Sequence, residues 1–143
     1  MKRICALDFG FRRIGWALSD LSQILVASSG AFEYHATENV IGVIQTLIKE
    51  KSVEKIVLGY PLNMQGEKTK QTESTIKFQQ TLEKVISIPI ELFDERLSSV
   101  QAGRNLHKMG IRTGHQKGKV DAMAASLILE TWLQRKAFRS HRE

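Results

Sequence analysis

The sequence predicts one α/β domain built on a mixed sheet, with helices on both faces. Three apolar segments separated by polar turns fill the first 32 residues, which is typical of an antiparallel meander. Two later apolar segments alternate with helical patterns, which is typical of parallel strands joined by crossover helices. With 143 residues, 42% of them hydrophobic, the chain is long enough to bury a core of this kind.

The meander begins with residues 4–7, an apolar run without polar alternation, so this strand should be covered on both faces. It ends at Asp8, and such an acid is costly unless a metal ion, a phosphate-bound metal or an arginine compensates it. After a turn with a glycine and two arginines, a second apolar segment runs to Asp20. A third strand is expected over residues 23–32.

The remaining elements follow from periodicity and from cap and turn residues. A helix opening at Thr37 carries an apolar stripe, and Ser98 is a good N-cap for a later helix. The expected order is that first helix, a strand at 55–60, a polar loop at 61–69, a helix to about 87, a strand at 88–95, a helix at 98–108, a glycine-bearing loop at 110–118 and a helix at 119–136. Residues 1–138 should form one domain, and residues 139–143 a basic tail.

Acidic residues stand at three comparable places in this order. Asp8 ends the first strand, Glu95 ends the strand at 88–95, and Asp121 opens the last helix on its apolar face. If the two strands are parallel and close, their acids meet at one edge, where the helix can add Asp121. Three oxygen donors there suit a hard divalent cation. Each acid also has an ordinary interpretation as a turn former, a solvated ion pair or a partner of the helix dipole.

Charge and composition limit the partners. The formal charge of +6 and a pI near 9.6 favour a polyanionic partner, although a basic protein without such a partner has the same balance. Cys5 is the single cysteine, so no internal disulfide can form, which fits the reducing cytoplasm. We expect a cytoplasmic protein, because we find neither a signal peptide nor an apolar run long enough to span a membrane.

Five segments resemble the YqgF (RuvX-like) family within the ribonuclease H-like superfamily. They lie at residues 6–10, 13–20, 59–66, 94–99 and 119–129, in the family's order. The resemblance implies a ribonuclease H-like five-stranded mixed sheet and metal-binding catalytic roles for Asp8, Glu95 and Asp121. It also implies a nuclease that matures the 5′ end of pre-16S ribosomal RNA, in ribosome biogenesis, or a Holliday junction resolvase. The chain departs from the family at Phe11, where a small hydroxyl residue is common, and at Ser98-Ser99, where a Thr-bearing pair is more usual.

The implied chemistry is metal-dependent hydrolysis of a phosphodiester bond. Two divalent ions about 3.5–4 Å apart can activate water and stabilise the leaving oxygen. Mg²⁺ or Mn²⁺ is the expected cofactor, and Mg²⁺ needs few protein ligands because it keeps several waters. Without metal, clustered carboxylates repel one another and raise at least one pKa. On that basis, neutralising Asp8 should leave the stability unchanged or raise it.

Two groups of basic residues are candidates for binding nucleic acid. Phosphate contacts position a substrate without reading its sequence. The candidates are Arg12, Arg13 and Arg96 beside the acids, and Arg104, Lys108, Arg112, Lys117 and Lys119 near the glycine-bearing loop. The first three could instead form ion pairs with Asp8, Asp94 or Glu95, and the second group could be a solvated charged loop. The expected partner is precursor ribosomal RNA or branched DNA, bound by a monomer or weak dimer.

Two other classes of protein remain open. The spacing from Asp8 to Gly15 also suits a phosphate-binding hairpin of actin-like and sugar-kinase ATPases, although those proteins need two such domains and this chain has one. Calorimetry with ATP discriminates this class. The other class is a non-catalytic RNA-binding factor in ribosome assembly, for which substitution of the acids would leave cellular function intact.

Overall fold

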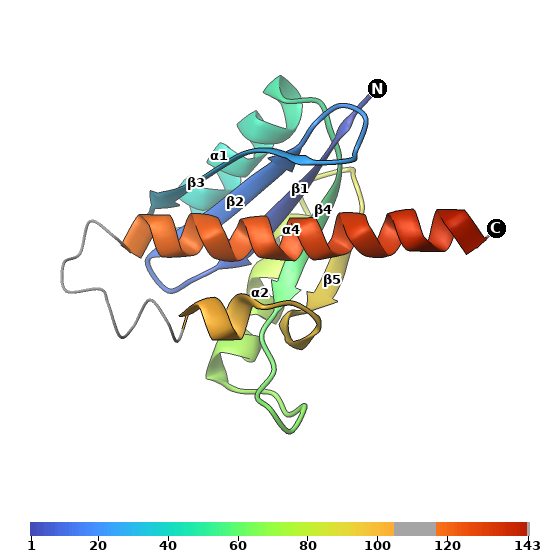
Figure 1. Cartoon of the computed structure of the whole chain (residues 1–143). Coiled ribbons are helices and arrows are strands. Elements are labelled where there is room, and N and C mark those ends of the chain that lie inside the picture. The colour runs from blue at the N-terminus through green and yellow to red at the C-terminus, as the bar shows by residue number, and fades with distance from the viewer. Residues whose placement is uncertain (105–116, 143) are drawn as a thin grey trace.

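The structure, a computed structural model, describes residues 1–104 and 117–142 (Figure 1). Its elements are β1 (Arg3–Phe9), β2 (Arg13–Ser19), β3 (Val26–Glu33), α1 (Thr37–Glu50), β4 (Val53–Tyr60), α2 (Lys70–Glu83), β5 (Ile90–Asp94), the one-turn 3-10 helix η1 (Glu95–Leu97) and α4 (Lys117–Arg142). The strand order is β3-β2-β1-β4-β5. The first three strands are antiparallel, and β4 runs parallel to both β1 and β5. The predicted mixed sheet is therefore confirmed.

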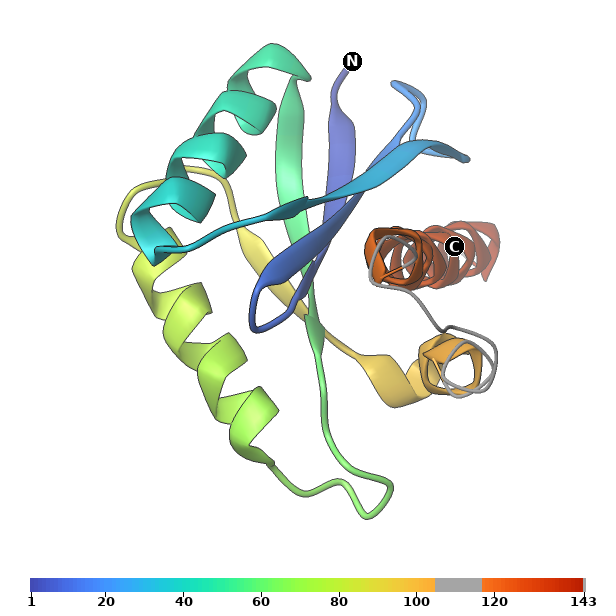
Figure 2. The same cartoon turned by 90° about the vertical axis from the view of Figure 1, so that its left-hand side faces the viewer.

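Helices cover both faces of the sheet, with α1 and α2 on one side and α4 on the other (Figure 2). The period of two in β1 divides its side chains between these layers. Cys5 and Leu7 belong to the core under α1 and α2, whereas Ile4 and Ala6 belong to the core under α4. Asp8 continues the second series and thus lies on the α4 face.

Burial raises the pKa of the Cys5 thiol to about 12, which makes this thiol a poor nucleophile.

Small residues let α4 cross the sheet closely at the level of Asp8. Gly15 of β2 pairs with Asp8, and a Cβ on Gly15 would lie only 2.1 Å from the carbonyl oxygen of Asp121. Ala124 and Ala125 of α4 are fully buried against the same face. The expectation that Asp121 faces the sheet is borne out by this packing, and a side chain at position 15 would push α4 away.

Two strands begin later than expected. The structure starts β3 at Val26 rather than at residue 23, because Asp20 closes a turn by accepting hydrogen bonds from the amides of Ile24 (2.7 Å) and Leu25 (2.9 Å). Gln23 lies in this turn with a φ of 57°, which no strand residue adopts. Pro89 delays β5 to Ile90, since proline has no amide to donate to the ladder.

Two helical boundaries also differ from the sequence prediction. Glu95 lies in η1 rather than at the end of a strand, because the Asp94 carboxylate accepts a hydrogen bond from the Arg96 amide (2.9 Å) and starts the turn. The last helix spans Lys117–Arg142, so Asp121 is its fifth residue and the helix continues through residues 139–142.

The helix predicted at 98–108 is described only in part. Residues 100–104 are helical, and the Ser98 hydroxyl accepts a hydrogen bond from the Val100 amide (3.4 Å), as expected of an N-cap. Residues 105–116, which include most of the glycine-bearing loop, lie outside the described residues. In the described part of the chain, no helix is long and apolar enough to cross a membrane.

Candidate active site

Asp8 and Glu95 meet at the carboxyl edge of the parallel strands. Asp8 lies near the end of β1 and Glu95 directly follows β5. Both strands flank β4 and run in its direction, so their carboxyl ends lie at the same edge. Between them stands Gly59 of β4. A Cβ there would lie 3.4 Å from the carboxyl carbon of Glu95 and 2.8 Å from Ile128. The bare backbone of Gly59 therefore gives Ile128 of α4 room to pack at this edge, beside the Glu95 carboxylate.

Arg104 lies between the two carboxylates. Its Nη2 atom is 2.7 Å from Asp8 Oδ1 and 3.1 Å from Glu95 Oε1. Asp8 is 7% exposed and Glu95 is 3% exposed, so this is a largely buried cluster of two acids and one base. Desolvation opposes the charge on Arg104, but the two carboxylates outweigh it and raise the pKa of the guanidinium. Arg104 thus pairs with the two acids here, and the phosphate contact expected of it stays a prediction.

Glu95 is the member of the cluster whose negative charge is least stabilised. Burial raises its pKa to about 7, with the Asp8 carboxylate contributing next and Arg104 opposing both. The contact with Arg104 is close, but neither Glu95 oxygen accepts a hydrogen bond of normal geometry from any described residue. Two buried, under-coordinated oxygens beside a second carboxylate fit a hard divalent cation, because such ions prefer oxygen ligands.

The raised pKa of Glu95 predicts how stability depends on pH in a chelator. Between its ordinary value of 4.5 and about 7, the folded state holds a proton that the unfolded chain has lost. The free energy of unfolding should therefore fall as pH rises through this window, by roughly 3–4 kcal/mol at most at 1.36 kcal/mol per pKa unit. We expect Glu95→Gln to gain stability relative to the unmodified protein from pH 4.5 to 7.5, as measured by urea unfolding.

Glu91→Gln is the matched control for that experiment. Burial disfavours the Glu91 carboxylate, but Lys55 and Trp132 outweigh this and hold its pKa below the usual range. Its contribution to stability is therefore lost only as pH falls below the window, and the difference between Glu91→Gln and the unmodified protein should stay flat above pH 5. Parallel curves for Glu95→Gln and Glu91→Gln would contradict the assignment of a raised pKa to Glu95.

Asp121 lies near this cluster but is bound to another cation. Its Oδ2 atom accepts a hydrogen bond from Arg13 Nε at 2.7 Å. The pKa of Asp121 is raised overall, because burial raises it more than Arg13 lowers it, and the Asp8 charge adds a smaller upward contribution. In the part of the chain that the structure describes, no three acidic, histidine or cysteine side chains are grouped closely enough to hold a metal. The structure thus joins two of the predicted acids, and leaves Asp121 beside them in an ion pair.

The other predicted phosphate-binding residues differ in whether they form an ion pair or are exposed to solvent. The Arg96 guanidinium donates three hydrogen bonds to the Asp94 carboxylate, at 2.7 to 3.1 Å, so the ion-pair alternative holds for it. Arg12 is exposed, with its guanidinium carbon 5.8 Å from the centre of the Phe11 ring, and Lys119 is exposed on α4. Lys108 and Arg112 lie outside the described residues, as does the side chain of Lys117.

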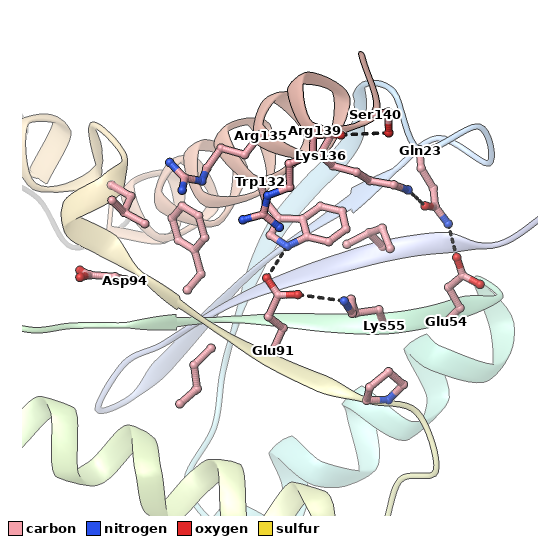
Figure 3. A pocket seen from close by; sticks show the side chains of 15 residues that line it. Gln23, Glu54, Lys55, Glu91, Asp94, Trp132, Arg135, Lys136, Arg139 and Ser140 are labelled. Atoms are coloured by element: carbon pink, nitrogen blue, oxygen red, sulfur yellow. Dashed lines mark hydrogen bonds and ion pairs between the residues drawn. The ribbon is translucent and has the colours of Figure 1, made fainter. Parts of the chain in front are cut away.

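A hollow of about 630 Å³ lies elsewhere, between β5 and the C-terminal half of α4 (Figure 3). Its central carboxylate, Glu91, accepts hydrogen bonds from Lys55 (2.8 Å) and from the Trp132 indole (2.7 Å). The Nζ atoms of Lys55 and Lys136 both lie over the Trp132 ring, 5.4 and 5.6 Å from its centre. Because these polar groups pair with one another, the hollow offers few unsatisfied polar atoms to a ligand.

Comparison with known proteins gives one family and one fold. The family model described as RuvX, Holliday junction resolvase, matches residues 2–135. A protein of Chloroflexus aurantiacus named "Putative pre-16S rRNA nuclease" is 41% identical over 130 residues, which cover 91% of this chain and 85% of the relative. A protein of Maridesulfovibrio salexigens with the same name is 36% identical over 133 residues, which cover 93% and 98%.

Solved structures with the same fold are much more distant in sequence. T. thermophilus RuvC in complex with a Holliday junction substrate superposes with a TM-score of 0.60 at 8% identity, covering 95% of this chain and 97% of that one. The yeast mitochondrial Holliday junction resolvase Ydc2 gives a TM-score of 0.59 at 13% identity, covering 98% and 81%. At these identities the likeness concerns the fold, and it agrees with the ribonuclease H-like sheet expected from the sequence.

Proposed function

The chain belongs to the RuvX family, and on this premise we propose that it is a metal-dependent endonuclease that acts in 5′-end maturation of pre-16S ribosomal RNA. The observation that carries the proposal is the buried pair of Asp8 and Glu95, with two Glu95 oxygens that accept no hydrogen bond from the described residues. Two buried carboxylates with unsatisfied oxygens cost stability, so a cluster of this kind at the carboxyl edge of parallel strands favours a role in binding a cation. The cytoplasm as its compartment stays a prediction.

Asp8 and Glu95 would hold the divalent ion, Mg²⁺ or Mn²⁺. One or two carboxylates are enough for Mg²⁺, because substrate phosphate and water complete its coordination. When bound, the ion supplies Lewis-acid stabilisation of the phosphate and lowers the pKa of bound water. We propose Asp121 as a third ligand, which requires its carboxylate to leave Arg13.

The ion pairs at this edge suggest how the residues respond to substrate. Arg13 is bound to Asp121 at 2.7 Å, and both side chains are partly exposed. A substrate phosphate can replace the carboxylate as the partner of Arg13, since guanidinium binds either anion. The exchange would release Asp121 toward the other two acids. Arg104 would likewise be free to contact phosphate once a metal ion neutralises Asp8 and Glu95.

A cleavage assay with two substrates tests this function. Purified protein is offered a precursor 16S RNA fragment and a four-way DNA junction, each with Mg²⁺, Mn²⁺ or a chelator. We expect metal-dependent cleavage of the RNA precursor and none in the chelator. Cleavage of the DNA junction alone would instead favour a resolvase, the second candidate, which the description of the family model supports. RNA binding without cleavage in either metal would favour a non-catalytic assembly factor.

A further inference from the structure

Phe11 stands in the turn between β1 and β2 and is 83% exposed. An exposed aromatic side chain alone is ordinary on a protein surface. This turn, however, joins the strand that carries Asp8 to the strand that carries Arg13, so Phe11 lies at the proposed catalytic edge. Two features distinguish Phe11: hydrogen bonds hold the backbone of its turn, and arginine side chains lie near its ring.

The turn that presents Phe11 is rigidly held. The Gly10 amide donates to the Arg13 carbonyl at 2.9 Å, and a Cβ on Gly10 would lie 2.6 Å from that carbonyl oxygen. Tyr34 fixes the turn from β3's side, with its hydroxyl donating to the Gly10 carbonyl (2.5 Å) and its amide to the Arg12 carbonyl (2.9 Å). The exposed ring is thus carried by a constrained backbone and does not sit on a loose loop.

The residue before the turn is anchored as well. The Phe9 ring stacks on the rings of Phe78 and Tyr34, with distances between ring centres of 4.3 and 6.0 Å. Gln71 of α2 donates a hydrogen bond to the Phe9 carbonyl at 2.6 Å. The chain therefore turns one aromatic side chain into the core and presents the next aromatic side chain, Phe11, to solvent.

Cations and the proposed site surround the exposed ring. Arg12 lies 5.8 Å from the ring centre. A hollow of about 300 Å³ is lined by Phe11, Arg12, Arg13 and Asp121, and Phe11 also borders a hollow of about 570 Å³ that extends to Tyr34. An aromatic face beside arginines is the arrangement by which proteins bind unpaired bases and their phosphates.

We propose that Phe11 stacks on an unpaired base of the substrate beside the cleaved phosphate, while Arg12 contacts the neighbouring phosphate. This inference rests on the proposed function. It makes Phe11 a specificity residue that directs the enzyme to single-stranded or unstacked nucleotides, because the ring needs an open base face. A base paired within a regular duplex offers no such face.

The test measures stacking directly, without cleavage. A single-stranded RNA carrying 2-aminopurine at successive positions is titrated in a chelator, beside the same sequence as a duplex. We expect the unmodified protein to quench 2-aminopurine at one or two positions. Phe11→Ala and Phe11→Leu should abolish this quenching and weaken binding to the single strand about 10-fold or more, with duplex binding unchanged. Phe11→Trp should keep both properties, since it retains an aromatic face.

Val43→Ala is the matched control, because it trims an exposed apolar residue in α1, on the opposite face from α4. Unchanged quenching and affinity in Phe11→Ala would overturn the inference, as would an equal loss for single strand and duplex. Binding and quenching by a protein that cleaves neither substrate in metal would leave Phe11 as a stacking residue while refuting the nuclease. No binding of nucleic acid by the unmodified protein would refute both.

Discussion

Asp8→Asn is expected to lower the rate of cleavage about 1,000-fold or more while preserving the fold and RNA binding. Asparagine keeps the shape of the side chain but removes the charge that would hold a divalent ion with Glu95. Losing metal-ion stabilisation of a phosphoryl transition state costs several kcal/mol, and each 1.36 kcal/mol is a factor of ten in rate. Glu95→Gln should act in the same way, and Asp121→Asn should also abolish cleavage if that carboxylate joins the site during reaction.

Single-turnover cleavage rates in saturating Mg²⁺ measure these effects, and calorimetric titration with Mn²⁺ reports metal binding separately. Glu38→Gln is the control, because it neutralises an exposed acid in α1, away from the carboxyl edge. A folded variant that cleaves at the normal rate would remove its residue from the site. A loss of cleavage with normal metal affinity at Asp121→Asn would assign Asp121 to positioning Arg13 instead.

Those parts of the site that depend on local pattern could be predicted from the sequence. The unbroken apolar run before Asp8 indicated a strand buried on both faces, and both cores do include β1. The spacing of Asp121 to the alanines of α4 indicated that it faces the sheet, as the contact with Gly15 shows. Periods of two and 3.6 residues are local properties, so they can be read without knowledge of the fold.

The ion pairs could not be predicted in the same way, because they join distant parts of the chain. Arg104 contacts Asp8 across 96 residues, and Arg13 contacts Asp121 across 108. One local signal for Arg104 was available, since it stands four residues after the buried Val100 and so shares its helical face. The argument from repulsion between the acids omitted this cation, and it therefore underestimated how well the acids are compensated without metal.

The roles of the two glycines beside the acids also required the structure. Gly15 and Gly59 lie within regular strands, where glycine weakens the strand and has no obvious use. Each proves to make room for α4, which approaches Gly15 with the Asp121 carbonyl and Gly59 with the Ile128 side chain. A glycine within a strand indicates that some other part of the chain approaches closely, but the sequence does not say which part.

Arg104→Ala is expected to lower the melting temperature strongly in a chelator and much less in saturating Mg²⁺. Its removal leaves Asp8 and Glu95 buried together without a cation. Removing one partner of a buried pair costs about 3–5 kcal/mol, and partial exposure of Arg104 argues for the lower end. About 3 kcal/mol corresponds to a shift of roughly 6–12 °C for a domain near this size. In Mg²⁺ the bound ion provides the missing charge, because its ligands are the same two carboxylates.

Thermal unfolding of four proteins under both conditions decides whether Arg104 occupies the place of the metal ion. Arg104→Lys retains a cation and should keep most of the stability in chelator. Arg96→Ala removes an exposed arginine from its pair with Asp94, so it should shift the melting temperature little and equally with and without Mg²⁺. An Arg104→Ala deficit of the same size in both conditions would mean that no ion replaces the guanidinium, and that the carboxylate pair serves stability alone. A deficit that Mg²⁺ removes would show that guanidinium and metal compete for one site, which makes Arg104 the residue that balances the acids until metal binds.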